Sequence, residues 1–259
     1  MNVRSFLMAA AIATPTLAFV HASPAATHFR ERGVEIACEP APSAPPATRE
    51  PLKVLFIGNS LTFRNCLPNV LALLAMSAGS PRQIHTGQVT VGAATLRQLL
   101  DSGTATAKIQ EEKWDYVILQ EASGLRSSAQ MAGAARAFDA EIKKVGAKTL
   151  LFDTWAWFGK PEDQPAIDHA FVSLAKELNA AVAPVGTAWQ LALQSAPDLS
   201  LYVDYHHPNV TGTYLAACVF YLVLDGHQQQ CPTIENGHIP AKDMDVARRA
   251  AMQAVAASP

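Results

Sequence analysis

Residues 54–61 read Val-Leu-Phe-Ile-Gly-Asn-Ser-Leu, an apolar run of strand length that ends at Gly58 and is followed two residues later by a hydroxyl group, that of Ser60. A continuously apolar, β-branched and aromatic run is typical of a parallel strand that is buried on both faces. Such strands carry their chemistry at the carboxyl end, where the loops open. Gly58 permits a tight turn there, and the backbone amides after it, at the start of the next helix, can bind an anion.

Strand-like and helix-like segments alternate along the chain that follows. The expected strands are 53–57, 83–91, 116–119, 148–152 and 181–185, and the expected helices are 68–78, 95–101, 105–113, 129–145, 166–178, 211–224 and 241–256. The strand at 83–91 is more polar, which favours an edge of the sheet, whereas the helix at 211–224 is strongly apolar and is expected to be buried. The alternation predicts parallel strands with right-handed crossovers, and therefore a three-layer α/β/α sandwich.

The first 51 residues have a different character. Residues 1–22 carry Arg4 and an apolar stretch broken by Pro15, and they end in small residues, which is typical of a removable secretory signal peptide. That stretch is shorter than the roughly 20 residues needed to cross a bilayer. Residues 23–51 are rich in Pro and Ala without periodicity, and we interpret them as a linker. One folded domain is expected at 52–259, in a secreted or periplasmic protein.

Composition restricts the partners. The 259 residues are 49% hydrophobic and 16% charged, with a formal net charge of -2. This balance gives no electrostatic basis for binding nucleic acid or an anionic membrane, and no later segment is long and apolar enough to predict stable membrane insertion. The oligomeric state is not indicated by the sequence.

Residues 204–209 read Asp-Tyr-His-His-Pro-Asn and supply the groups that an unactivated serine lacks. An alcohol is a poor nucleophile near neutral pH unless an imidazole takes its proton, and a carboxylate fixes the tautomer of that imidazole. A Gly-x-Ser is by itself more often a turn, and a single Asp-x-x-His more often a loop contact. Because both occur in one chain in this order, we predict Ser60 as the nucleophile, His207 as the base and Asp204 as its orienting acid.

These two blocks together resemble those of the SGNH/GDSL hydrolase superfamily. Gly58-Asn59-Ser60-Leu61 is similar to its first block, usually Gly-Asp-Ser-Leu, and Asp204-x-x-His207-Pro208 to its last block, with the resemblance spanning about residues 52–226. The resemblance implies a five-stranded parallel sheet in the flavodoxin-like order 2-1-3-4-5. In that order the ligand site lies at the switch point between the first and third strands. Ser60 follows the first of these strands, and Gln120 follows the third.

The family pattern also implies an oxyanion hole. It consists of the nucleophile's backbone amide, a glycine after the second strand and an asparagine in a Gly-x-Asn-Asp block after the third. Gly92 matches the glycine position, although a glycine required only by a turn is an equal alternative. The Gly-x-Asn-Asp block is absent, and the third strand is instead followed by Gln120 and Glu121. We predict the Ser60 amide, Gly92 and the Gln120 side chain as the three donors.

Four further residues are candidates for substrate binding: Asn59, Asn65, Glu121 and Trp155. Local hydrogen bonds to the backbone explain the two asparagines equally well. Glu121 is favoured slightly as structural. The tryptophans of the segment Trp155-Ala156-Trp157 can stack on a sugar or an acyl chain, or they can cap the core.

No metal or cofactor is predicted. The rings of the adjacent residues His206 and His207 are expected to point to opposite sides of an extended chain, and no nucleotide-binding fingerprint is present. Three full pairings are open to the four cysteines, Cys38, Cys66, Cys218 and Cys231. A Cys218–Cys231 disulfide is the most economical, with Cys66 expected to be a buried thiol.

The resemblance implies hydrolysis of carboxylic esters through an acyl-enzyme. Acetylated carbohydrates and other small acyl esters are the expected substrates. A lysophospholipase or thioesterase is the alternative enzyme, and a catalytically inactive glycan-binding protein of the same fold is the alternative from another class.

Overall fold

The computed structural model describes residues 49–80, 82–225, 230–234 and 237–258. The predicted signal peptide at 1–22 and all but the last residues of the predicted linker at 23–51 lie outside the described residues. Among the helices that are described, none combines the length and the apolar character that crossing a membrane requires.

The centre of the fold is a sheet of five parallel strands. They are β1 (Leu52–Gly58), β2 (Ile84–Thr90), β3 (Tyr116–Leu119), β4 (Lys148–Phe152) and β5 (Ala181–Ala183). Their order is β2-β1-β3-β4-β5, and every neighbouring pair is parallel. This confirms the predicted fold and strand order. The polar strand β2 lies at an edge, as its composition indicates.

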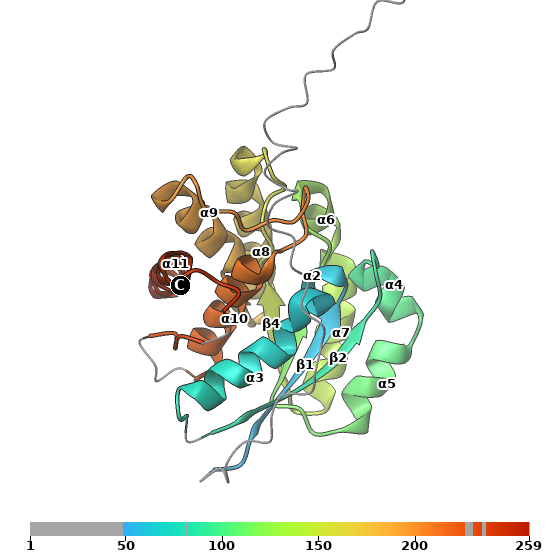
Figure 1. The fold of residues 1–259 in the computed structure, drawn as a ribbon. Coiled ribbons are helices and arrows are strands. Elements are labelled where there is room, and N and C mark those ends of the chain that lie inside the picture. Colours follow the sequence, from blue (N-terminus) through green and yellow to red (C-terminus); the bar gives the residue numbers. More distant parts are fainter. Residues whose placement is uncertain (1–48, 81, 226–229, 235–236, 259) are drawn as a thin grey trace, which may run out of the picture.

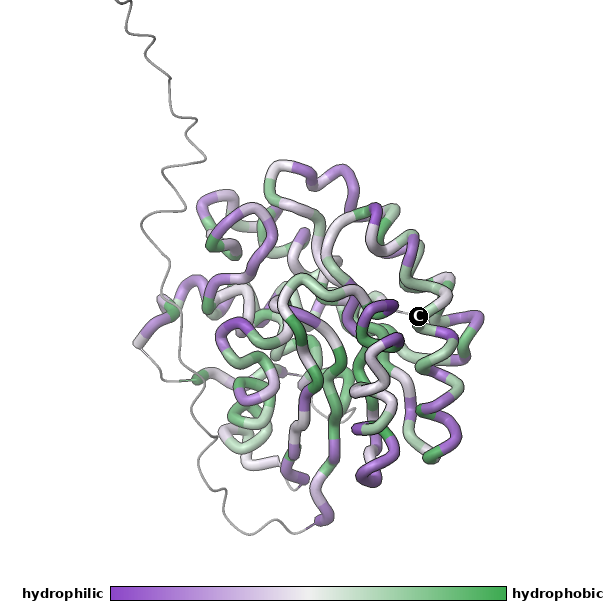
Figure 2. The backbone as a smooth tube through the Cα atoms, turned by 90° about the vertical axis from the view of Figure 1, so that its right-hand side faces the viewer, coloured by the Kyte–Doolittle hydropathy of each residue, from purple (hydrophilic) through white to green (hydrophobic). Residues whose placement is uncertain are grey.

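Helices cover both faces of the sheet and complete three layers (Figure 1). One layer contains α3 (Leu67–Ser77), α9 (Val185–Ser195), α10 (Val210–Asp225) and α11 (Ala241–Ala257), and the other contains α4 (Leu96–Asp101), α5 (Thr104–Glu111), α7 (Ala132–Lys144) and α8 (Gln164–Leu178). Alternate residues of β1 face the two layers, because Val54 and Phe56 pack in one core and Leu55 and Ile57 in the other. Figure 2 shows hydrophobic stretches in the interior of the fold and hydrophilic ones toward the outside.

Shorter elements lie at the carboxyl edge of the sheet, where they shape the loops. They are α2 (Ser60–Phe63), the 3-10 turn η1 (Arg64–Cys66), α6 (Leu125–Gln130) and the 3-10 turn η2 (Pro161–Asp163). Neither these elements nor α9 were predicted from the sequence pattern. The predicted fifth strand is too long, because Val185 already begins α9. Gly186, near the start of α9, is a poor helix former and weakens the helical signal in the sequence. A glycine is needed at this position because a Cβ would lie 2.4 Å from the Thr154 carbonyl oxygen.

The disulfide pattern matches the prediction in part. Cys218 of α10 is bonded to Cys231, as predicted. Cys66 is disulfide-bonded as well, so the expectation of a buried thiol is wrong. Its position at the end of η1 gives no local sequence signal for a bond, because disulfide partners need not be close in the chain.

Candidate active site

Ser60 is presented at the switch point by a capped helical turn. Asn59 is the N-cap of α2, and its Oδ1 accepts a hydrogen bond of 3.1 Å from the backbone N–H of Leu61. Ser60 is therefore the first residue of the helix, and its own N–H has no acceptor within the helix. This arrangement leaves both the hydroxyl and the amide of Ser60 directed at the carboxyl edge of the sheet.

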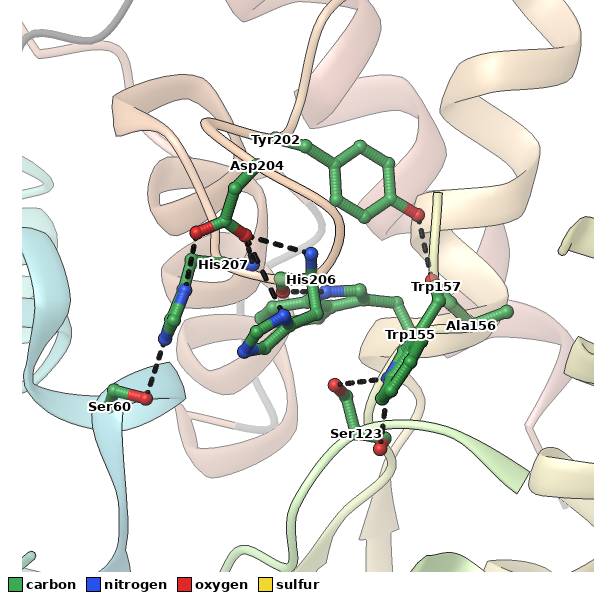
Figure 3. Close-up of polar contacts among 9 residues, drawn as sticks. All are labelled: Ser60, Ser123, Trp155, Ala156, Trp157, Tyr202, Asp204, His206 and His207. Carbon is green, nitrogen blue, oxygen red and sulfur yellow. Dashed lines mark hydrogen bonds and ion pairs between the residues drawn. The ribbon is translucent and has the colours of Figure 1, made fainter. Parts of the chain in front are cut away.

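The structure brings the three predicted catalytic side chains into one hydrogen-bonded chain (Figure 3). Ser60 Oγ lies 2.8 Å from His207 Nε2, and His207 Nδ1 lies 2.7 Å from Asp204 Oδ2. The loop that carries the acid and the base is closed on itself, because Val203 N–H donates to the His207 carbonyl at 3.0 Å. A hydroxyl, an imidazole and a carboxylate in this sequence form the arrangement that activates serine nucleophiles.

The charge of Asp204 is fixed by its own loop. Burial on its own would raise the pKa of Asp204, but hydrogen bonds from the backbone N–H groups of His206 and His207 and from the His207 ring lower it to about 2. The two backbone bonds, of 2.9 and 2.8 Å, both reach Oδ1. Asp204 is consequently ionised at neutral pH. An ionised acceptor at Nδ1 keeps the proton of His207 on that nitrogen and leaves Nε2 free to accept the proton of Ser60.

Gly92 lies at the same edge as Ser60. Gly58 of β1 is in register with Thr90 of β2, so Ser60 and Gly92 each lie two residues beyond a matched pair. The loop is tied back by Val91 N–H, which donates to the Gly58 carbonyl at 3.2 Å. No hydrogen bond from the Gly92 N–H is found among the described residues, and a Cβ at this position would meet nothing within 4 Å. Gly92 therefore remains a candidate oxyanion donor at the edge of the sheet that carries Ser60.

The prediction that Gln120 is the third oxyanion donor is wrong. Its side chain is fully buried, and Nε2 donates to Asn59 Oδ1 at 2.9 Å and to the Glu121 carbonyl at 2.6 Å, which uses both amide hydrogens. Oε1 accepts from Asn59 N–H at 2.7 Å, so the orientation of the amide is unambiguous. Gln120 holds the turn before the nucleophile. Gly58 is required beside it, since a Cβ there would lie 2.3 Å from Gln120 Oε1.

The four predicted substrate-binding residues are buried, which contradicts that role. The exposed fractions of Asn59, Asn65, Glu121 and Trp155 are 2%, 4%, 3% and 0%. Asn59 Nδ2 donates to the Ala94 carbonyl at 2.8 Å, which joins the nucleophile turn to the Gly92 loop.

Each of the other three has a structural contact. Asn65 Nδ2 donates at 3.0 Å to the Pro208 carbonyl, beside His207. Glu121 accepts from the Leu96 N–H at 3.1 Å, and Trp155 Nε1 donates to the His206 carbonyl at 2.8 Å. The four residues position the loops of the site.

A second imidazole lies beside the base, contrary to the expectation that the two rings point apart. The ring centroids of His206 and His207 are 4.0 Å apart, and Asp204, His206 and His207 place potential metal-ligand atoms within 4.8 Å of one another. Both ring nitrogens of His207 are already in the hydrogen-bonded chain. A metal ion bound by all three residues would have to replace one of those bonds, so metal binding and serine activation compete for the same ring.

Asp153, directly after the end of β4, is a buried carboxyl next to the partly exposed carboxyl of Asp168. Burial, and then the charge of the neighbouring Asp168, raise the pKa of Asp153 well above its ordinary value. Asp168 in turn accepts from Gln164 Nε2 at 2.6 Å and from Thr187 Oγ1 at 3.2 Å. Asp153 therefore keeps its proton beside Asp168, and the bond from Thr187 to Asp168 joins α9 to α8.

This pair predicts a pH dependence of stability. Above the ordinary Asp pKa of 3.8, the unfolded chain releases the proton of Asp153 and the folded protein retains it. The free energy of unfolding then falls as pH rises, by up to about 1.4 kcal/mol per pH unit for one proton. We expect Asp153→Asn to remove this slope, measured by urea unfolding between pH 5 and pH 8. Asp198→Asn, at an exposed position, is the control; equal slopes in wild type and Asp153→Asn would contradict the assignment.

Comparison with known proteins supports the fold. No protein-family model and no curated protein sequence matches the chain. A DUF4886 family protein from Bacteroides uniformis has a similar structure, with a TM-score of 0.65 and 20% identity over 81% of this chain and 96% of that protein. A candidate SGNH hydrolase from Slackia heliotrinireducens has a TM-score of 0.57 and 26% identity, over 67% of this chain and 99% of that protein.

The structure is also similar to that of an enzyme whose activity is known. A variant of an acetyl xylan esterase from Geobacillus stearothermophilus is similar with a TM-score of 0.56 and 16% identity, over 71% of this chain and 97% of that enzyme. The structural neighbours thus include an SGNH-type hydrolase and an esterase, and this chain has their fold.

Proposed function

We propose that the protein is a serine ester hydrolase that works through an acyl-enzyme. The observation that carries the proposal is the hydrogen-bonded chain from Ser60 through His207 to Asp204, with its 2.8 and 2.7 Å contacts. Ser60 Oγ attacks the ester carbonyl carbon while His207 Nε2 takes its proton. The tetrahedral intermediate then expels the alcohol, which receives that proton from His207, and the acyl group remains on Ser60. Water, deprotonated by His207, releases the acid and restores Ser60.

Two backbone donors are proposed for the oxyanion: the N–H groups of Ser60 and Gly92. The amide of Ser60 is at the first position of α2, so the helix N-terminus adds a favourable electrostatic field. Gln120, Asn59 and Glu121 act as positioning residues, because their bonds connect the two turns that carry these donors. Each backbone donor is expected to supply about 3 kcal/mol of transition-state stabilisation.

Acetylated carbohydrates or other small acyl esters are the proposed substrates. The similarity to an acetyl xylan esterase supports this choice. An exposed aromatic side chain near the proposed base also supports it, since half of the Trp157 surface is accessible and its ring lies beside that of His206. Lysophospholipid or thioester hydrolysis remains the alternative activity. A catalytically inactive glycan-binding protein is disfavoured because the groups of the proposed triad are already within hydrogen-bonding distance.

The proposal is tested with a fluorophosphonate probe, which labels only an activated serine. We expect the wild-type protein to be labelled and to hydrolyse p-nitrophenyl acetate, and Ser60→Ala to do neither. The labelled peptide should contain Ser60. If the folded wild-type protein shows neither labelling nor turnover, the hydrolase proposal fails and the glycan-binding alternative is favoured.

A further inference from the structure

Trp157 differs from the other tryptophans of this chain in its exposure. The chain has four, and Trp114, Trp155 and Trp189 are at most 5% exposed, whereas half of the Trp157 surface is accessible. Its Nε1 is nevertheless fixed, because it donates to the carbonyl oxygen and to the hydroxyl of Ser123, at 3.1 Å each. A large aromatic ring that is held in place but left uncovered provides a preformed contact surface for a ligand.

The exposed indole continues the row of rings that begins at the proposed base. The ring centroids of His207 and His206 are 4.0 Å apart, and those of His206 and Trp157 are 5.8 Å apart. Figure 3 shows this row leading away from Ser60. The proposed oxyanion donors follow β1 and β2, while Trp157 follows β4, on the other side of the switch point. Because the departing alcohol takes its proton from His207, His206 and Trp157 lie on the leaving-group side of the ester.

A cavity of about 350 Å³ borders Trp157, at the end of this row. Its aromatic lining consists of Trp157, Phe158, Trp189 and Tyr202, and the amide side chains of Gln190 and Gln194 also border it. Phe158 is tied to the loop of the acid and base, since its N–H donates to the Tyr205 carbonyl at 2.8 Å. A cavity of this size holds a small ring system. Trp157 belongs both to the cavity and to the row, and it therefore links the cavity to the ring of His206 beside the proposed base.

Resting on the proposed hydrolase activity, we infer that Trp157 and His206 bind the alcohol part of the ester as a sugar ring, and that the cavity binds the next sugar of an oligosaccharide. A pyranose ring has a C–H face that packs on an indole and a rim of hydroxyls that need partners. The His206 ring provides a partner beside Trp157, and the side chains of Gln190 and Gln194 provide partners at the cavity. An alkyl alcohol would cover the same polar groups without hydrogen-bonding to them, which costs free energy.

The inference is tested by comparing esters of different length. The kcat/KM values are measured for acetylated xylotriose, cellotriose and mannotriose, each against its acetylated monosaccharide, with p-nitrophenyl acetate as the reference. For at least one sugar we expect the trisaccharide to be preferred about tenfold, the effect of one good aromatic contact. In Trp157→Ala, and in Leu193→Trp, which fills the cavity, the ratio of trisaccharide to p-nitrophenyl acetate activity should fall by a similar factor.

Controls separate the sugar site from folding and from the hydrolase proposal. Val172→Trp adds an indole at an exposed position of α8 and should leave the ratio unchanged. Trp157→Phe keeps a ring and should retain part of the preference. In Ser60→Ala, binding of the free trisaccharide should alter the fluorescence of the one exposed tryptophan. Equal activity on tri- and monosaccharide esters of all three sugars would overturn the inference. If the wild-type protein hydrolyses none of these esters but Ser60→Ala still shows the fluorescence change, the hydrolase proposal is overturned instead.

Discussion

Replacing Asp204 by asparagine is expected to lower kcat for p-nitrophenyl acetate about 10⁴-fold, as the loss of the orienting acid does in serine hydrolases of this mechanism. The reason lies in the hydrogen bonds of the acid. Oδ1 accepts the backbone N–H groups of His206 and His207, so an asparagine must place its own oxygen there. Its NH₂ group then occupies the position of Oδ2 and faces His207 Nδ1.

An NH₂ group at that position donates to Nδ1 and forces the ring proton of His207 onto Nε2. His207 can then no longer accept the proton of Ser60, although the side chains keep their places. The thermal unfolding midpoint should change little, and fluorophosphonate labelling should slow in parallel with kcat. Asp101→Asn, at an exposed position on α4, is the matched control and should behave as wild type. A kcat of Asp204→Asn within tenfold of wild type would show that Asp204 does not orient the base.

The fold and the positions of Ser60, Asp204 and His207 could be anticipated because they depend on local pattern and topology. Buried strands are continuous apolar runs, and their alternation with helices determines how the strands connect. Once the sheet order is expected, the serine after the first strand and the Asp-x-x-His loop must reach the same edge. The edge position of β2 follows from its polar residues in the same way.

The residues that were misassigned are those whose roles depend on partners far away in the chain. Trp155 and Trp157 are two residues apart, yet Trp155 is buried because it stacks on Trp189 of α9, with ring centroids 4.0 Å apart. Because α9 was not predicted from the sequence, the burial of Trp155 could not be distinguished from the exposure of Trp157. Gln120 and Asn59 are hydrogen-bonded to each other. A signal for this pair was present, since both positions depart from the usual SGNH blocks, and two departures at once indicate a compensating contact.

The pair formed by Gln120 and Asn59 leads to the second large effect, that of Gln120→Glu. The change preserves size but replaces the NH₂ group by an oxygen, opposite Asn59 Oδ1 and the Glu121 carbonyl. A protonated glutamic acid restores only one of the two donated bonds and places an oxygen against the other acceptor oxygen, which costs about 1–3 kcal/mol. An ionised glutamate would place a negative charge at a fully buried position, opposite two acceptor oxygens. Because this disfavours the charged form, the folded variant retains the proton of the glutamic acid.

Stability should therefore depend on pH. The unfolded chain releases the new proton above about pH 4.3 while the folded variant keeps it, so the free energy of unfolding falls as pH rises, by up to about 1.4 kcal/mol per pH unit beyond the wild-type slope. Because the turn that presents Ser60 shifts, kcat should also fall about 10²-fold. Urea unfolding from pH 5 to pH 9 and p-nitrophenyl acetate kinetics measure the two effects.

Gln253→Glu makes the same chemical change at an exposed position of α11 and should affect neither measurement. The comparison distinguishes a positioning role for Gln120 from simple filling of space, since a space-filling residue would tolerate an isosteric replacement at every pH. If Gln120→Glu matched wild type in unfolding free energy at pH 5 and pH 9 and in kcat, the buried amide would not be what holds the nucleophile turn against β3. The geometry of the oxyanion hole would then have to come from the backbone of the turn alone.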